Sequence, residues 1–388
     1  MQRPSLRIQR RAADRLAAGH VWVYASDVDR PDNARPGDVV TVLDHRGLPL
    51  GTAHFSAASQ IALRLFSTQI EELDAAFYRE RLAAAIAHRE RAVTDSNACR
   101  LVFSEADRLP GLIVDRYDDT LVLQTLTQGM DRAQPLIVAA LEELLHPRGI
   151  WERNDAAVRT KEQLSFRSGP LSGAPEPSVD VRMNGVLFQA DLKAGQKTGV
   201  YLDQRENYRA AARWARGRAL DCFTSTGGFA LHLAKRCESV EAVDSGAAAL
   251  AAAARNAARN EIGNIDFREA DVFDLLTEHR NAGRRFQTII LDPPAFAKTR
   301  GSLDGAGRGY KEINLRAMQL LEPGGLLVTC SCSHHMSETM LLEAVVAAAR
   351  DNRRTVRLLE RRTQATDHPI LPAIPETHYL KCLILEVL

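Results

Sequence analysis

The chain lacks the cysteine patterns of disulfide-stapled and zinc-binding proteins. Its 388 residues include six cysteines, at positions 99, 222, 237, 330, 332 and 382, without a C-x-x-C pair or a His/Cys spacing suited to zinc. A secretory signal pattern and an apolar run of membrane-spanning length are also absent. We therefore expect a cytoplasmic protein with reduced thiols, no metal site and no membrane association.

The sequence also lacks a strong overall charge. Its net charge is +1, so the field of the whole molecule makes no argument for a nucleic-acid partner. Arginines do gather near the N-terminus, where only Asp14 opposes them, and this cluster fits an RNA footprint and a solvated basic face equally well. The cluster consists of Arg3, Arg7, Arg10, Arg11 and Arg15.

A third missing feature is the G-x-G-x-x-G motif that seats a dinucleotide pyrophosphate. Residues 219–244 instead predict strand, glycine turn, helix and strand, with Gly227 and Gly228 in the turn. Asp221 and Asp244 lie at the two strand ends, where a carboxylate can bind ribose hydroxyls. This pattern favours S-adenosylmethionine (SAM) over NAD, and a purely structural βαβ turn is the alternative.

Residues 1–73 predict a small antiparallel barrel. Short β-like runs at 21–24, 39–43, 50–55 and 61–66 are separated by turn signals such as Pro36-Gly37. The segment from Leu16 to Tyr24 together with the turn at Pro36 resembles the PUA domain, which implies RNA binding. Trp22 and Tyr24 serve equally well as core aromatics.

A central α+β domain is predicted for residues 74–178, ending in a linker rich in serine, glycine and proline at 165–178. The third domain, residues 179–388, alternates strands and helices as a doubly wound α/β sheet requires. Asp221, Asp244, Asp271 and Asp292 each follow a predicted strand, which places them along the carboxyl edge where ligands bind. Before the glycine turn, Asp203 or Gln204 either meets a polar end of the ligand or caps the next helix.

Two stretches in the C-terminal half contain the candidate catalytic residues. Asp292-Pro-Pro-Ala-Phe296 is a stiff loop whose Asp can accept hydrogen bonds from an exocyclic amine and whose Phe can stack on a base. Cys330 and Cys332 lie at the end of the next strand and point to one face of it. A thiolate there could add to carbon 6 of a pyrimidine, which makes carbon 5 nucleophilic enough to take a methyl group.

The chain resembles the RlmI-type family of bacterial 23S rRNA cytosine-C5 methyltransferases. The resemblance rests on the stretches KTGVYLDQREN, LDCFTSTGGFAL, LDPPAFAK, GRGYKEIN, TCSCSHHM and TDHPILPAIPETHYLK. It implies a PUA-like β-barrel, a central α+β domain and a class I Rossmann-like, SAM-dependent methyltransferase domain. It further implies SAM contacts at Asp221, Gly227, Gly228, Asp244 and Asp271, Asp292 beside the base, and Cys332 as nucleophile.

Some questions stay open at this stage. Related RNA cytosine-C5 enzymes carry a second cysteine where this chain has Ala295, so the group that removes the C5 proton is not identified. Cys330 remains an alternative nucleophile. Alternative functions are N-methylation of an rRNA purine and a non-catalytic role in ribosome assembly. The modified nucleotide, the choice between naked rRNA and a ribosomal particle, and the existence of a homodimer are likewise open.

Overall fold

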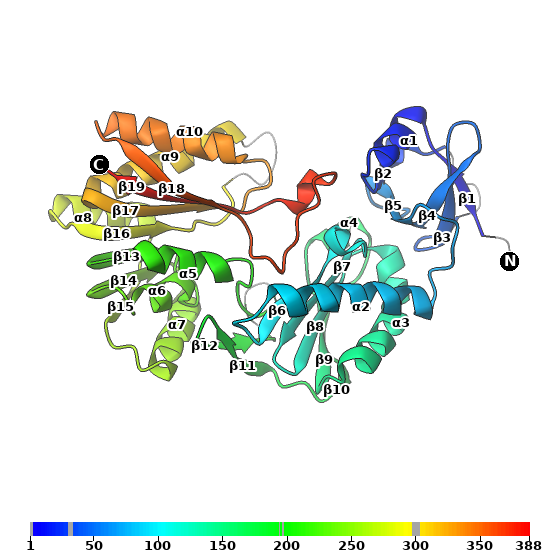
Figure 1. Ribbon diagram of the computed structural model, residues 1–388, viewed down its shortest axis with the longest axis horizontal. Helices are drawn as coiled ribbons and strands as arrows, with labels where there is room; N and C mark the ends of the chain where they lie inside the picture. The colour runs from blue at the N-terminus through cyan, green and yellow to red at the C-terminus, as the bar shows by residue number, and fades with distance from the viewer. Residues whose placement is uncertain (1–2, 30–33, 194, 196–197, 297–302) are drawn as a thin grey trace. The chain divides into compact units, whose positions relative to one another are not determined.

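The computed structural model describes residues 3–29, 34–193, 195, 198–296 and 303–388, so Lys197 and the residues after Phe296 in the predicted loop lie outside the described part. The chain forms two compact units, each assembled from separate segments (Figure 1). Unit 1 contains Met1–Val181, Ala190–Val200 and Thr366–Thr377. Unit 2 contains Arg182–Gln189, Tyr201–Ala365 and His378–Leu388.

The N-terminal part of unit 1 is a five-stranded sheet with one short helix, as the barrel-like pattern predicts. Its strands follow the order β1-β3-β4-β5-β2, and all described pairs are antiparallel except β1 with β3. Alternating residues such as Val40, Val42 and Leu63 form its core. The elements are β1 (Ser5–Arg7), α1 (Arg10–Ala17), β2 (Trp22–Tyr24), β3 (Val39–Leu43), β4 (Pro49–Phe55) and β5 (Ile61–Ser67).

The central part of unit 1 packs two long helices against a second five-stranded sheet, in the order β10-β9-β8-β7-β6. Each helix begins with a side-chain cap: Asp74 accepts a hydrogen bond from the Phe77 amide, and Thr127 accepts one from the Met130 amide. The elements are α2 (Ala75–Ala92), β6 (Ala98–Phe103), β7 (Leu112–Tyr117), β8 (Thr120–Thr125), α3 (Gln128–Leu145), β9 (Gly149–Asn154), α4 (Val158–Lys161) and β10 (Arg167–Gly173).

The predicted linker at 165–178 is wrong for half of its length. Residues 167–173 form β10, which pairs antiparallel with β9. The strand tolerates Pro170 and two glycines because it lies at the edge of its sheet and its pairing shifts between Pro170 and Ser172. A composition rich in turn-forming residues therefore did not distinguish an edge strand from a linker.

A two-stranded hairpin, β11 (Ser178–Met183) with β12 (Val186–Asp191), precedes the large sheet and turns at Asn184-Gly185. Both turn residues have positive φ, 51° and 75°, as a tight hairpin turn requires. The large sheet of unit 2 has seven strands in the order β15-β14-β13-β16-β17-β19-β18. Strands β13 to β17 are all parallel to one another, and β19 is antiparallel to both β17 and β18.

Helices cover both faces of this sheet: α5, α6 and α7 on one face, and α8, α9 and α10 on the other (Figure 1). Successive residues of β13 divide between the two cores, since Ala219 packs with α5 and α6 whereas Leu220 packs with α8 to α10. This is the doubly wound α/β fold that the sequence predicts. Its elements are α5 (Arg205–Trp214), β13 (Arg218–Cys222), α6 (Gly228–Leu233), β14 (Ser239–Asp244), α7 (Ala247–Arg259), β15 (Ile265–Glu269), α8 (Val272–Asn281), β16 (Phe286–Leu291), α9 (Leu303–Leu320), β17 (Leu321–Ser331), α10 (Glu338–Asp351), β18 (Val356–Arg362) and β19 (Lys381–Val387).

Candidate active site

The predicted aspartates of unit 2 lie at the carboxyl ends of four adjacent parallel strands. Asp221 is the next-to-last residue of β13, and Asp244 is the last residue of β14. Asp271 follows β15, and Asp292 directly follows β16. The chain order reverses between β13 and β16, which is the point of such a sheet where ligands bind. Asp221 and Asp292 therefore flank the switch point.

Asp221 is completely buried and only half satisfied by hydrogen bonds. Its Oδ2 accepts from the Thr224 hydroxyl at 2.6 Å and from the Ala230 amide at 2.9 Å. Its buried Oδ1 has no hydrogen-bond partner among the described residues. Burial raises the pKa of Asp221 to about 7, and the charges of Asp292 and Asp244 act in the same direction. A buried carboxylate with an unpaired oxygen is suited to a cationic or hydroxyl-bearing ligand.

The turn between β13 and α6 has an unusual backbone. Phe223, Ser225 and Gly227 all have positive φ, at 65°, 49° and 88°. Gly228 lies so close to Tyr208 that a Cβ atom there would be 2.3 Å from the tyrosine ring. The two predicted glycines thus have different roles: Gly227 adopts a left-handed conformation, and Gly228 makes room for a ring.

Asp244 and Asp271, at the ends of β14 and β15, make hydrogen bonds to the backbone of the loops at this end of the sheet. Asp244 accepts hydrogen bonds from the Ser225 and Gly246 amides, both at 2.9 Å, and so ties the glycine turn to the end of β14. Asp271 is exposed and caps α8 by accepting from the Phe273 and Asp274 amides. Asp271 therefore has a structural role that explains its position without a ligand.

Asp203 and Gln204 are buried beside the switch point, and Gln204, the N-cap residue of α5, makes no side-chain capping hydrogen bond within the described part of the chain. The Tyr379 hydroxyl donates to Asp203 Oδ2 at 2.6 Å. Gln204 Nε2 donates to Asp292 Oδ2 at 3.0 Å and accepts from Asn207 through Oε1 at 2.7 Å. Gln204 therefore does not cap α5 through its side chain and instead orients the aspartate of the Asp-Pro-Pro loop.

Two tyrosines that the sequence analysis did not single out, Tyr201 and Tyr208, are affected by the charges of these carboxylates. Burial, then the charges of Asp292 and Asp203, raise the pKa of Tyr201 well above its usual range, and Tyr208 is affected in the same way. Both rings therefore stay neutral at physiological pH. Their only sequence signal was their place in the polar stretch before the glycine turn.

Phe296, expected to be available for stacking on a base, contacts protein rings. Its centroid lies 4.8 Å from that of Tyr310 and 6.3 Å from that of Phe273. The phenylalanine is half-buried, so part of its surface remains accessible. Tyr310 in turn bonds to the hydroxyl of Ser333 at 3.3 Å, which connects this aromatic group to the end of β17.

The two candidate cysteines have different environments. Cys330 is completely buried in the core under α5 and α6 and lies opposite Cys382 of β19. Burial raises the pKa of Cys330 well above its usual range, so its thiol is held protonated. Cys332 lies one residue beyond the end of β17 and is partly exposed. The two histidines that follow, His334 and His335, are exposed.

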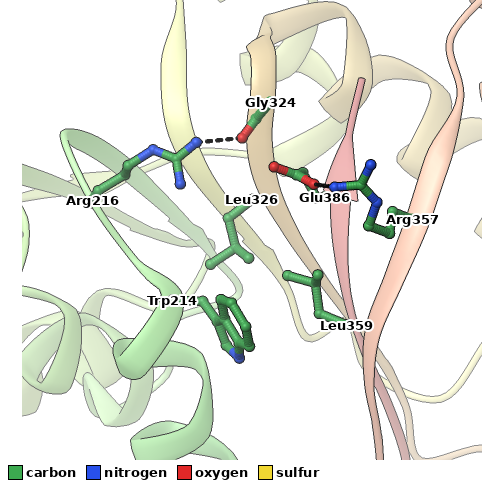
Figure 2. Close-up of a pocket in the computed structure, with 7 residues that line it drawn as sticks. All are labelled: Trp214, Arg216, Gly324, Leu326, Arg357, Leu359 and Glu386. Carbon is green, nitrogen blue, oxygen red and sulfur yellow. Dashed lines mark hydrogen bonds and ion pairs between the residues drawn. The ribbon is translucent and has the colours of Figure 1, made fainter.

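A separate hollow of about 240 Å³ lies at the amino ends of the strands of the same sheet (Figure 2). Arg216 precedes β13 there, and Gly324 is the fourth residue of β17. The guanidinium of Arg216 donates to the Gly324 carbonyl, and Arg357 of β18 pairs with Glu386 of the adjacent strand β19 at 2.8 Å. Since its charges are paired internally and it lies at the amino ends of the strands, it is not part of the candidate site.

No cluster of three or more His, Cys, Asp or Glu side chains in the described ranges could hold a metal ion. Among the helices of the described part, none is long and apolar enough to cross a membrane.

Comparison with known proteins agrees with this geometry. A family model for S-adenosylmethionine-dependent methyltransferases matches residues 157–385, and a model for PUA-like domains matches residues 6–68. The protein is thus a SAM-dependent methyltransferase with a PUA-like domain, and the fold expected from the sequence is confirmed.

Curated relatives narrow this class. Ribosomal RNA large subunit methyltransferase I of Shewanella denitrificans is 41% identical over 382 residues, covering 96% of each chain. The protein of the same name from Tolumonas auensis is 41% identical over 383 residues, with the same coverage. The chain belongs to the family of ribosomal RNA large subunit methyltransferase I. The crystal structure of SMU.776 complexed with SAH, 20% identical, has the same fold, with a TM-score of 0.86 over 99% of this chain and 100% of the other.

Proposed function

We propose that the protein methylates carbon 5 of a cytosine in 23S rRNA, with Cys332 as the nucleophile. The observation that carries this proposal is the partly exposed Cys332 at the end of β17, beside the strand that ends in Asp292. The negative charges of Cys332 and Asp292 both raise the pKa of Tyr201, after the larger effect of burial, so one small region contains both groups. A thiol and a carboxylate at adjacent strand ends suit attack on a polarised pyrimidine.

In this mechanism the Cys332 thiolate adds to carbon 6, forming a C–S bond and moving electron density to carbon 5. Carbon 5 then takes the methyl group, loses its proton, and the elimination of the thiolate restores the aromatic base. The cofactor SAM supplies the electrophilic methyl group. Asp292, held by Gln204, accepts a hydrogen bond from the cytosine amino group and thereby polarises the ring.

The residues at the neighbouring strand ends fit the methyl donor. The unpaired Oδ1 of Asp221 is suited to its positively charged methionine end, and Asp244 is suited to the ribose hydroxyls. Gly227 and Gly228 let the backbone approach the ligand closely. Asp203 orients this region through Tyr379, and Asp271 acts through the end of α8.

The choice of RNA rests on the relatives and on the N-terminal domain. The curated relatives are named for methylation of large-subunit ribosomal RNA, and the PUA-like domain implies an RNA partner. The described arginines of the N-terminal cluster contribute less free charge than their number suggests. Arg11 and Arg15 both pair with Asp27, Arg3 pairs with Glu72, and Arg10 lies 3.9 Å from Asp14. Among the arginines of this cluster, Arg7 is therefore the best candidate for a phosphate contact.

Nucleoside mass spectrometry tests the reaction directly. Unmodified 23S rRNA transcript, free and in reconstituted large-subunit particles, is incubated with SAM and wild-type protein, Cys332→Ala or Cys330→Ala. We expect 5-methylcytosine with wild type and Cys330→Ala and none with Cys332→Ala, whose folding is checked by thermal unfolding. A methylated purine, or an active Cys332→Ala variant, would contradict the cysteine mechanism and favour N-methylation.

A trapping experiment tests the covalent step by itself. A transcript with 5-fluorocytidine cannot lose a proton from carbon 5, so the adduct should persist after methyl transfer. We expect a denaturation-resistant RNA–protein complex whose cross-linked peptide contains Cys332. Its absence with a substrate that is methylated when unfluorinated would argue against a C6 adduct.

A further inference from the structure

Lys381, the first residue of β19, is a buried cation without a role in the reaction described above. Its exposed fraction is 3%, although lysine is rarely buried without a partner. Antiparallel pairing of β19 with β17 places Lys381 opposite Ser331, the residue just before Cys332. The lysine therefore lies on the strand next to the proposed nucleophile.

Two backbone carbonyls hold the ammonium in place. Lys381 Nζ donates to the Ser333 carbonyl at 2.6 Å and to the Tyr379 carbonyl at 2.8 Å. Ser333 is the residue directly after Cys332, so the ammonium is anchored on the turn that carries the thiol. Carbonyls satisfy N–H donors but supply no counter-charge, and a buried ammonium favours a nearby anion.

The titratable groups around Cys332 lie on four other elements and on its own turn, where His334 and His335 follow it. Tyr201, before α5, and Tyr310, on α9, are both neutral, because burial raises the pKa of each. Asp292, after β16, adds negative charge that opposes a thiolate. Lys381, on β19, is the positively charged one among the described groups whose pKa responds to Cys332: burial lowers its pKa to about 8, and Cys332 opposes that shift.

We propose that Lys381 is a positioning residue that raises the thiolate fraction of Cys332, through a buried ammonium fixed on the carbonyls of Ser333 and Tyr379. This inference rests on the proposed function, in which Cys332 is the nucleophile. On ionisation the S–H bond breaks, the electron pair stays on sulfur, and the proton passes to water; no bond forms to Lys381. The ammonium compensates the sulfur charge before RNA binds.

Alkylation of the native protein measures this ionisation without any RNA. The rate of iodoacetamide reaction at Cys332 is followed against pH by peptide fragmentation, with Cys332→Ala to identify the signal. The remaining cysteines are buried and serve as slow internal references. In the wild type we expect the Cys332 inflection about one pH unit or more below the usual value of about 8.5.

Removal of the ammonium should reverse this shift. Lys381→Met keeps most of the length and apolar volume, and we expect its alkylation at pH 7 to slow about tenfold or more. Lys381→Arg should recover part of the rate because it keeps the charge. Lys235→Met, which removes an exposed lysine of the same unit, is the matched control and should leave the rate unchanged.

The outcomes separate the two proposals. A wild-type inflection at or above about 8.5 overturns the role of Lys381 without the use of any variant. An inflection that is low in wild type and unmoved in folded Lys381→Met overturns it as well. If the role holds, the acidic limb of the methylation rate profile should move to higher pH in Lys381→Met. Failure of the proposed function is seen separately, as methylation by Cys332→Ala.

Discussion

Asp221 combines complete burial with an unpaired oxygen, so its protonation should be coupled to cofactor binding. Its pKa is raised to about 7, and a cationic ligand group at Oδ1 would lower it again. Binding then releases a proton, so we expect SAM affinity to rise with pH, by up to about tenfold between pH 6 and 8. Isothermal titration calorimetry over this range measures both the affinity and the released protons.

Asp221→Asn is the matched variant for this prediction, since it keeps the shape and removes the titrating group. It should bind SAM more weakly at pH 8 and retain only the pH dependence of the ligand's own amino group. A wild-type affinity that is flat over the range, or equal pH dependence in both proteins, would contradict the prediction.

At the scale of single residues, sequence patterns located the strand-end aspartates well, because an acidic residue after an apolar run is a local signal. They could not show that Asp271 caps a helix while Asp221 is buried with a free oxygen. Lys381 appeared only as the last residue of a stretch that carries the family resemblance and had no role assigned to it, since its position beside Cys332 depends on pairing between β19 and β17. Contacts between distant strands are invisible to any local pattern.

At the scale of elements, the contact between α5 and α6 depends on the missing side chain of Gly228. An alanine there would bring Cβ within 2.3 Å of Tyr208 Cζ, which the helices can relieve only by moving apart. We expect Gly228→Ala to lower the free energy of unfolding by about 1–3 kcal/mol, measured by urea denaturation. SAM binding should weaken too, because the glycine turn moves with α6.

Gly263→Ala supplies the control, because a Cβ atom at that loop position meets nothing within 4 Å. Its change in unfolding free energy should stay within about 0.5 kcal/mol. Equal losses in the two variants would contradict a specific contact with Tyr208.

Element types were predictable where the hydrophobic period was clear, as in the N-terminal strands and the alternating β/α order of unit 2. The failure at β10 has a physical cause. Edge strands need fewer backbone donors and side-chain contacts than central strands, so they accept the residues that also make linkers. Only the partner strand β9 distinguishes the two cases.

For the whole molecule, the two compact units predict an uneven response to the cofactor. A ligand that binds only the folded state stabilises it by about 2.7 kcal/mol at one hundred times its Kd. We expect hydrogen exchange to slow at the amides of β13 and β14 in unit 2 when SAM is added, and to stay unchanged at those of β7 and β8 in unit 1. Equal slowing in both units would mean that they open together.

The composition of the units also sets a limit on what sequence can predict at this scale. Changes in local pattern suggested boundaries near residues 73 and 178. Residues 190–200 and 366–377 nevertheless pack within unit 1, far along the chain from most of it. The assignment of these two segments to unit 1 follows from their packing, which cannot be predicted from local composition.

The chain passes from one unit to the other five times, after residues 181, 189, 200, 365 and 377. Domains joined by a single linker can be exchanged between genes by one recombination event at that linker. Here an exchange of either unit would need five matched breakpoints. We therefore expect the RNA-facing and methyl-transferring parts of this lineage to have been inherited as one block, with sequence change rather than gene fusion as the route to new specificity.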